Sequence, residues 1–427
     1  MVFMKSCIYS TVFAVLLAGC MAKGKDDTSL KTGAWRATIA IQGHELPFGL
    51  EISRDASGGY DAIIKNADER LLLDEVSIEG DTLNASLHIF DANIKAKIDG
   101  EKLTGYFIKN YDPGYKHVFH ATFGQTHRFS NETNAHPGDF SGKYAVTFFS
   151  KTDTTIAVGI FQQIGDSVTG TFLTPTGDYR YLQGDVVGDT LHLSTFDGNH
   201  AYLFKAYKNG NDRLIGEYFS GKASYETWTA IKDDQAKLPA AESLTFLKQG
   251  YDKIEFNFPD VNGEKISLSD EKYRNKVIIL QLSGSWCPNC MDETKFLSPW
   301  YNENKGRGVE IIGLAYERKD DFAYASDRVK KMISKLDIKY DFVIAGTNDK
   351  IKAAETLPML NKVVAFPTTI FIGKDGKVKK IHTGFSGPGT GLYYHEFIQD
   401  FNETVNELLQ EKSTSMNNQG DSPVDKM

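Results

Sequence analysis

The chain has 427 residues, of which 41% are hydrophobic and 24% are charged, and its formal net charge is −8. This composition is typical of a globular protein, and the length suggests about three domains. The acidic balance argues against nucleic-acid binding, which depends on clustered lysine and arginine. A single short apolar stretch excludes a polytopic membrane protein. Four cysteines are too few for a scaffold held together by disulfides.

The amino terminus has the features of an export signal in their usual order. Lys5 precedes an apolar run, Ile8 to Gly19, that is too short to span a bilayer. The run ends in Leu-Ala-Gly-Cys at 17–20, which resembles the lipobox of bacterial lipoproteins. The alternative is an ordinary cleavable signal followed by a chance cysteine. We expect a signal peptide at 1–19, lipidation of Cys20 and a polar tether at 20–32. The resemblance implies a cell-envelope protein that is anchored to a membrane by lipid and faces the periplasm or the cell surface.

Residues 33–233 contain a weak internal repeat. Gly-Asp-Thr-Leu at 80–83 returns at 188–191, and Phe-Asp-x-Asn at 90–93 returns at 196–199. Alternating apolar residues and frequent turn signals predict strands throughout. We expect two small antiparallel barrels or sandwiches at 33–125 and 140–233, or one larger barrel shared by both repeats. The histidines lack cysteine or carboxylate neighbours at ligand spacing, so no metal site is expected.

A linker at 234–253 leads to a segment with a different pattern. The sequence predicts a hairpin at 254–269, buried strands at 276–282 and 309–316, and helices at 288–301 and 321–335. Further strands are predicted at 340–344, 368–372 and 377–382, and a closing helix at 393–409. This order predicts an α/β domain at 254–411, followed by a disordered tail at 412–427. The expected fold class is therefore multidomain, with a duplicated all-β region before an α/β domain.

The α/β segment contains a cysteine pair in Trp286-Cys287-Pro288-Asn289-Cys290. Pro288 suits the first position of a helix, which places Cys287 at the helix N-terminus. The helix dipole and free backbone N–H groups favour the thiolate there. We expect an exposed Cys287 to attack a disulfide and a more buried Cys290 to resolve the mixed disulfide, with a Cys287–Cys290 disulfide as the oxidised form.

This motif resembles the thioredoxin superfamily, and more narrowly the TlpA/ResA-like membrane-anchored thiol-disulfide oxidoreductases, over about 254–410. The resemblance implies a thioredoxin-like fold and a role for Glu293 in thiol proton transfer; an exposed carboxylate in the first helical turn is the alternative. Asp292 is expected to be solvated. Phe366-Pro367 matches the loop in which these folds place a cis-proline facing the cysteines. Residues that would contact substrate are Trp286, Pro288, Phe366 and Pro367.

The sequence thus favours a thiol-disulfide oxidoreductase that reduces protein disulfides outside the cytoplasm. The resemblance implies protein disulfide or thiol substrates and a membrane thiol-disulfide relay as electron donor, without a cofactor. A thiol peroxidase of the peroxiredoxin type is one alternative. That family has Thr or Ser three residues before its reactive cysteine, where this chain has Gly284. A non-enzymatic surface binding module on a thioredoxin-like scaffold is the other alternative. The motif lacks the further ligands of a zinc site and the histidine of a haem-attachment site.

Overall fold

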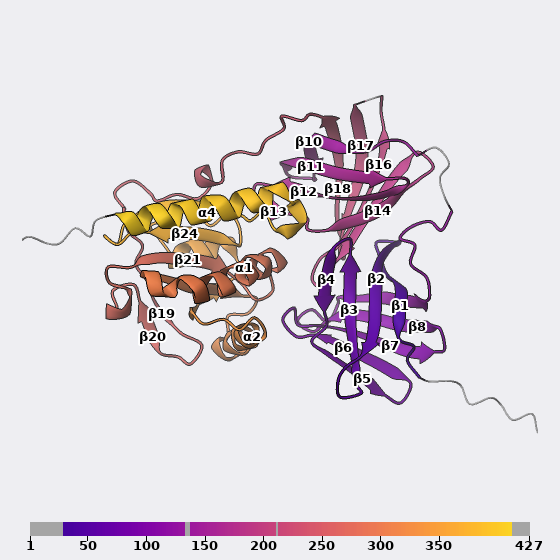
Figure 1. Cartoon of the computed structure of the whole chain (residues 1–427), viewed down its shortest axis with the longest axis horizontal. Coiled ribbons are helices and arrows are strands. Elements are labelled where there is room, and N and C mark those ends of the chain that lie inside the picture. The colour runs from indigo at the N-terminus through magenta and orange to yellow at the C-terminus, as the bar shows by residue number, and fades with distance from the viewer. Residues whose placement is uncertain (1–28, 133–136, 211, 412–427) are drawn as a thin grey trace, which may run out of the picture.

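The computed structural model describes residues 29–132, 137–210 and 212–411. Two β-sheet units and one α/β unit follow one another along the chain and pack together, the α/β unit lying beside both sheets (Figure 1). The predicted signal peptide, Cys20 and the tail at 412–427 lie outside the described residues, and the tether is described only from Ser29.

The first unit is a nine-stranded antiparallel sheet in the order β4-β3-β2-β1-β9-β8-β7-β6-β5. Strands such as β6 alternate buried and half-buried residues, which is the pattern of a sheet with one face in a core. The segment between β4 and β5 connects the two ends of the sheet. The N–H of Leu73 donates to the carbonyl of Ala62 in β3, and the N–H of Asp74 donates to the carbonyl of Ser86 in β6, both at 2.9 Å. Its strands are β1 (Gly33–Ile41), β2 (His44–Arg54), β3 (Tyr60–Asn66), β4 (Glu69–Leu72), β5 (Glu75–Glu79), β6 (Thr82–Leu87), β7 (Ala92–Asp99), β8 (Lys102–Lys109) and β9 (Lys116–Phe123).

The second unit repeats this connectivity and closes on itself. Its first strand pairs with both its second and its last strand, as in the first unit, and an additional β11–β12 pairing completes a ring. The alternative of one barrel shared by both repeats is therefore wrong. Aromatic side chains, including Phe148, Phe172 and Trp228, fill the interior. The strands are β10 (Gly142–Phe149), β11 (Thr154–Ile164), β12 (Ser167–Thr174), β13 (Gly177–Asp178), β14 (Leu182–Val187), β15 (Thr190–Phe196), β16 (Ala201–Lys208), β17 (Arg213–Ser220) and β18 (Ser224–Lys232).

The α/β unit contains a five-stranded sheet in the order β23-β22-β21-β24-β25. The β21, β22 and β23 strands are parallel to one another, and β24 is antiparallel to β21. The edge strand β25 is antiparallel to β24 and therefore runs in the same direction as β21. The predicted hairpin is present as β19 (Asn257–Pro259) and β20 (Lys265–Ser267). The strands of the main sheet are β21 (Val277–Ser283), β22 (Val309–Glu317), β23 (Asp341–Thr347), β24 (Thr368–Ile372) and β25 (Val378–Thr383).

Helices cover both faces of this sheet. Side chains of α1 (Pro288–Asn304), α2 (Phe322–Lys335) and α4 (Leu392–Gln410) belong to one core cluster, and those of α3 (Lys350–Thr356) to another. Short 3-10 turns lie at Ala241–Ser243, Glu271–Tyr273, Lys305–Arg307 and Pro388–Thr390. Within the described part of the chain, no helix combines the length and apolar character needed to cross a bilayer.

Candidate active site

The cysteine pair lies where β21 gives way to α1. All seven residues of β21 are buried, so the strand holds the turn that follows at a fixed place in the core. Cys287 is the N-cap of α1 and Pro288 is the first helical residue, as the sequence predicts. The backbone N–H of Cys290 donates to Sγ of Cys287 at 3.2 Å. The helix N-terminus therefore aims a donor at the sulfur that would carry negative charge after reduction.

The two cysteines form a disulfide, and their Cα atoms are 5.2 Å apart. Cys287 is only 5% exposed and Cys290 2%. The prediction of an exposed Cys287 is thus wrong for this disulfide-bonded form, although Cys287 remains the more accessible sulfur. Burial arises because Cys287 packs in one apolar cluster with Phe366, with Trp286 lying against it.

The Phe366–Pro367 peptide bond is cis, which confirms the prediction for this loop. The carbonyl oxygen of Phe366 lies 3.5 Å from Sγ of Cys287. Both residues of the loop are buried. The half-buried ring of Trp286 meets the Phe366 ring edge-on, with centroids 6.0 Å apart, and its Nε1 donates to the carbonyl of Tyr316 at 2.8 Å. The predicted substrate-contact residues Trp286, Pro288, Phe366 and Pro367 are thereby brought around the cysteine pair.

Glu293 is fully buried beneath the cysteine turn, so the alternative of an exposed carboxylate is wrong. Its two oxygens accept hydrogen bonds from Nε2 of Gln281 at 2.7 Å and from the hydroxyl of Thr369 at 2.5 Å. Burial raises the pKa of Glu293, although both hydrogen bonds favour the ionised form. The carboxyl group therefore links α1 to the central strand β21 and to the strand that follows the cis-proline.

A second buried acid, Glu317, supports the turn before the cysteines. It accepts the backbone N–H of Ser285 at 2.8 Å and the Ser285 hydroxyl at 2.9 Å. Burial raises its pKa as well. Sequence reasoning missed this residue because β22 and the turn are separated by about one βα unit, and nothing local marks the pairing. Glu317 fixes the backbone from which Trp286 and Cys287 extend.

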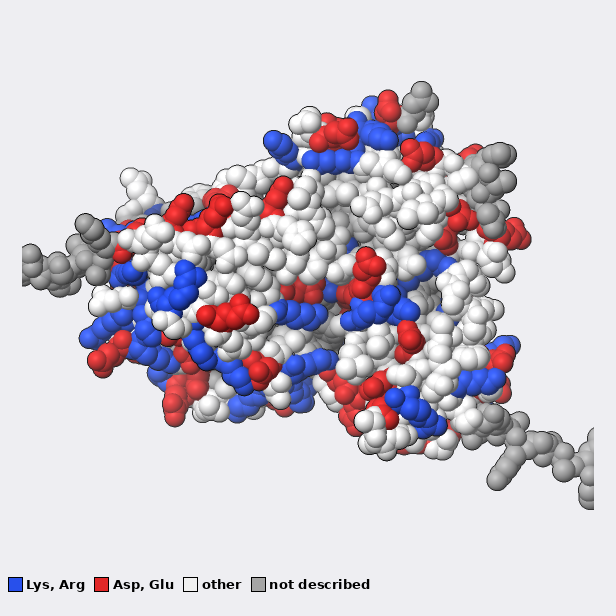
Figure 2. Space-filling model, viewed as in Figure 1, with Lys and Arg blue, Asp and Glu red and all other residues white. Residues whose placement is uncertain are grey.

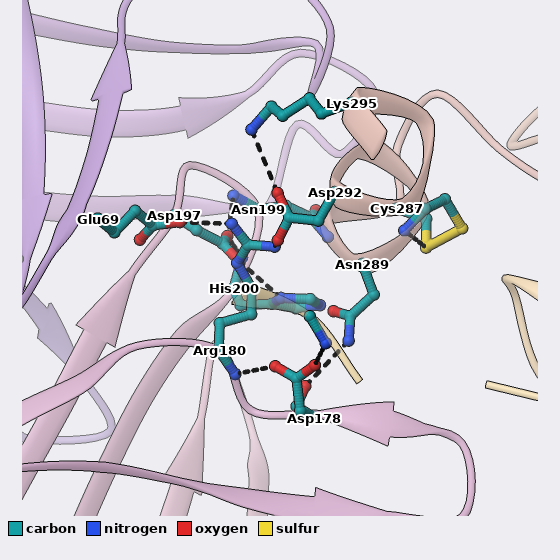
Figure 3. Close-up of polar contacts among 12 residues, drawn as sticks. Glu69, Asp178, Arg180, Asp197, Asn199, His200, Cys287, Asn289, Asp292 and Lys295 are labelled. Atoms are coloured by element: carbon teal, nitrogen blue, oxygen red, sulfur yellow. Dashed lines mark hydrogen bonds and ion pairs between the residues drawn. A yellow bond between two sulfur atoms is a disulfide. The ribbon is translucent and has the colours of Figure 1, made fainter. Parts of the chain in front are cut away.

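The first two turns of α1 also contact the β-region. Asn289, between the two cysteines, donates from Nδ2 to the carbonyl of Asp178 at 3.1 Å. Asp292 is 6% exposed and forms an ion pair with Arg180. The prediction of a solvated Asp292 is wrong because the second β-unit packs on this side of the helix. Figure 3 shows Asn289 and Asp292 pointing toward the β-region, whereas the disulfide lies on the other side of the helical turn.

Arg180 joins all three units of the molecule. Its buried guanidinium forms ion pairs with Asp292 of the α/β unit, with Glu69 of the first β-unit and with Asp197 of its own unit, the last at 3.2 Å. These three carboxylates raise the pKa of Arg180 well above its ordinary value despite its burial. His200 pairs with Asp197 at 2.9 Å, and His88 and His382 pair with Glu75 and Glu242 at 3.1 and 3.7 Å, so three of the described histidines have carboxylate partners after all.

Asp178, two residues before Arg180, connects the loop before α4 to the backbone of Arg180. Its carboxylate accepts the backbone N–H groups of Gly387 at 2.7 Å and Arg180 at 2.6 Å. Burial raises the pKa of Asp178 to about 6, because these hydrogen bonds and the Arg180 charge offset only part of the desolvation.

One group of side chains has metal-ligand geometry. Glu242, His382 and Asp400 bring ligand atoms within 4.8 Å of one another. The ammonium of Lys380 already pairs with Asp400 at 2.6 Å and with Glu242 at 3.8 Å, so a cation of the chain itself balances these carboxylates.

Positive and negative side chains are interspersed on the face shown in Figure 2.

Comparisons with known proteins match the α/β unit. The AhpC/TSA family model matches residues 250–381. Thiol-disulfide oxidoreductase ResA of Bacillus thuringiensis subsp. konkukian is 31% identical over 129 residues, which are 30% of this chain and 66% of that protein. ResA of Bacillus subtilis is 28% identical over 138 residues, 32% of this chain and 69% of that protein. The chain thus spans slightly less than two thirds of the first of these relatives.

Two solved structures are similar to part of this chain. A thioredoxin-family thiol:disulfide interchange protein from Chlorobium tepidum TLS is 20% identical, with 38% of this chain and 98% of that chain covered and a TM-score of 0.29. A thiol-disulfide oxidoreductase from Bacteroides fragilis NCTC 9343 is 23% identical, with 34% and 99% covered and a TM-score of 0.26.

Proposed function

We propose that this chain, whose residues 250–381 form a thioredoxin-like domain of the AhpC/TSA type, is a thiol-disulfide oxidoreductase that reduces protein disulfides in the cell envelope. One observation carries the proposal. A cysteine pair caps the N-terminus of α1, and the cis-proline loop places the carbonyl of Phe366 3.5 Å from Sγ of Cys287. The ResA relatives, which are named thiol-disulfide oxidoreductases, support the same reaction class.

The reaction begins with the reduced form of the pair. The Cys287 thiolate attacks one sulfur of a substrate disulfide, so that a mixed disulfide forms and the other substrate sulfur leaves as a thiolate and takes up a proton. Cys290 then loses its proton and attacks Sγ of Cys287, which forms the intramolecular disulfide and releases the second substrate thiolate for protonation. Two electrons and two protons pass from the chain to the substrate, and a dithiol donor must return them.

Both steps of the reaction move a proton, and a buried carboxyl group near the thiols can accept or donate one. Glu293 is three residues after Cys290, and its raised pKa brings it toward the range in which a carboxyl group exchanges protons near neutral pH. We assign it the proton-transfer role during resolution. The cis-proline loop supplies backbone on which an extended substrate segment can lie beside Cys287.

The cellular setting belongs to the proposal as well. The lipobox-like sequence at 17–20 supports lipidation of Cys20 and anchoring to an envelope membrane. Besides Cys287 and Cys290 the sequence has only Cys7 and Cys20, so it offers no second close pair that could reduce the first. A membrane thiol-disulfide relay would then supply the electrons.

The peroxidase alternative is not favoured by the surroundings of Gly284. A Cβ atom at this position would lie 2.3 Å from Nε1 of Trp286 and 2.7 Å from the carbonyl of Tyr316. The Thr or Ser of the peroxiredoxin pattern would therefore displace the indole that packs on the cis-proline loop.

A trapping experiment tests the proposal. The Cys290→Ser variant should accumulate a mixed disulfide between Cys287 and its substrates, because the resolving sulfur is absent. Cys287→Ser is the matched control and should trap far less. Mass spectrometry of non-reduced complexes from cells identifies the linked cysteine. Equal trapping by both variants, or none by Cys290→Ser, would contradict the proposal. Full rescue of a deletion strain by the double variant would favour the binding module instead.

A further inference from the structure

A cleft of about 350 Å³ lies beside the cysteine motif, where all three units meet. Lys109 and Tyr111 line it from the first β-unit, Asn199 from the second, and Trp286 and Arg318 from the α/β unit. None of the described residues that line this cleft carries a carboxylate. Its size is at the small end of the range for ligand sites, about 300–1,000 Å³. It can therefore admit one or two side chains of a partner, but not a folded element.

Two cations of the cleft share one neutral acceptor. Lys109 is 7% exposed, and its ammonium donates to the backbone carbonyl and the Oδ1 atom of Asn199 at 2.8 and 3.3 Å. Nη2 of Arg318 donates to the same Oδ1 at 2.9 Å. Among the described residues, no carboxylate lies within ion-pair distance of either cation. Burial and the nearby Arg318 charge lower the pKa of Lys109 to about 8.

Aromatic rings hold Arg318 in place without neutralising it. Its guanidinium lies 4.0 Å from the ring centre of Tyr111 and 5.2 Å from that of Trp286, and its Nε has no hydrogen-bond partner among the described residues. A guanidinium stacked on aromatic rings keeps its charge, and its planar set of N–H groups is suited to binding a carboxylate. The lining residues that the structure describes thus include Lys109, Arg318 and Lys222 and no carboxylate; the carboxylates that act on Lys109 and Arg318 from outside the lining lie beyond ion-pair distance of these two cations.

The cleft is connected to the reacting sulfurs through Trp286. This residue precedes Cys287 in the chain and packs against Phe366, whose carbonyl is next to Sγ of Cys287. A polypeptide lying along the cis-proline loop would therefore pass the mouth of the cleft close to its own reacting cysteine.

We propose that this cleft is a specificity site that binds an acidic side chain near the reacting cysteine of the substrate polypeptide. The inference rests on the proposed function and names the substrate class of the same site. The two β-units would then select substrates, since Lys109 and Asn199 belong to them. Lys222, which also lines the cleft and is paired with Asp112 only at 3.8 Å, adds a further positive charge.

The test compares two disulfide-bridged peptides that differ only next to one cysteine, where one carries three glutamates and the other three glutamines. The reduced full-length chain should reduce the acidic peptide at least about fivefold faster at low salt, and added KCl should shrink this ratio. Arg318→Gln should bring the ratio of the two rate constants close to one. Arg213→Gln is the matched control, because Arg213 is exposed at the start of β17, away from the end at Ser220 that lines the cleft.

Two outcomes would overturn the inference. One is that the unmodified chain reduces both peptides at equal rates. The other is that Arg318→Gln leaves the ratio of the two rate constants unchanged; if both rates fall equally, Arg318 has a structural role. Lys222→Gln, a change at a half-exposed residue, should lower the ratio about twofold and serves if Arg318→Gln does not fold. Reduction of neither peptide would instead refute the proposed function, and the inference with it.

Discussion

Replacing Arg180 with methionine should destabilise the folded chain, because it leaves three buried carboxylates without their shared cation. The side chains of Glu69, Asp197 and Asp292 are 6%, 1% and 7% exposed. Removing one partner of a buried ion pair typically costs about 3–5 kcal/mol. Methionine retains much of the apolar packing of the arginine stem, so the loss is chiefly electrostatic.

The remaining contacts place the cost at the lower end of this range. Asp197 keeps His200 at 2.9 Å, and Asp292 keeps Lys295 at 3.2 Å. Among the described residues, Glu69 keeps only the neutral amide of Asn66, at 2.8 Å. We therefore expect a loss of about 3 kcal/mol in the free energy of unfolding. In a Glu69→Gln background the same substitution should cost less than about 2 kcal/mol, because the least compensated carboxylate is gone.

Urea unfolding at pH 7 measures both effects. Tryptophan fluorescence follows all three units, through Trp35, Trp228, Trp286 and Trp300, and far-ultraviolet circular dichroism follows the secondary structure. Arg213→Met is the control and should change stability by less than about 0.5 kcal/mol, since Arg213 is exposed. A loss below about 1 kcal/mol for Arg180→Met, or an equal loss in the Glu69→Gln background, would show that Arg180 does not compensate these carboxylates.

Two further predictions concern buried acids. Glu293→Gln should slow release of the mixed disulfide roughly 100-fold near neutral pH and flatten the pH dependence of that step, as measured by quenched-flow alkylation; an unchanged pH profile would exclude the proton-transfer role. Asp178→Asn should become more stable relative to the unmodified chain as pH rises from about 3 to 7, by up to about 3 kcal/mol. Below about pH 3 the Asp178 carboxyl is neutral in both states, whereas above its raised pKa of about 6 the folded state holds a buried charge. A difference between the two unfolding free energies that does not vary with pH would contradict this assignment.

The local chemistry of the site could be read from the sequence. Proline at the first helical position identifies the start of α1, and Phe366-Pro367 before an apolar strand identifies the cis-proline loop. These features depend on residues next to each other in the chain, whose backbone preferences are intrinsic. The strands of both β-units were predictable for the same reason, since alternation is a local pattern.

The surroundings of the site could not be read in this way. Asp292 and Arg180 are 112 residues apart in the chain, and no local pattern indicates that they meet. An acidic residue near the start of a helix is usually solvated, and only the packing of the second β-unit on α1 buries this one. The short helix α3 was also missed, because seven residues carry too little periodicity to identify a helix.

The stoichiometry of exchange shows whether Cys287 and Cys290 react with a substrate disulfide as one dithiol pair. The fully reduced, purified chain is mixed with an excess of a disulfide-containing protein, quenched with acid, alkylated and digested for mass spectrometry. We expect one Cys287–Cys290 disulfide to form for each substrate disulfide that is reduced, and no reaction with Cys287→Ser. Substrate reduction without formation of that disulfide, or an active Cys287→Ser variant, would contradict it.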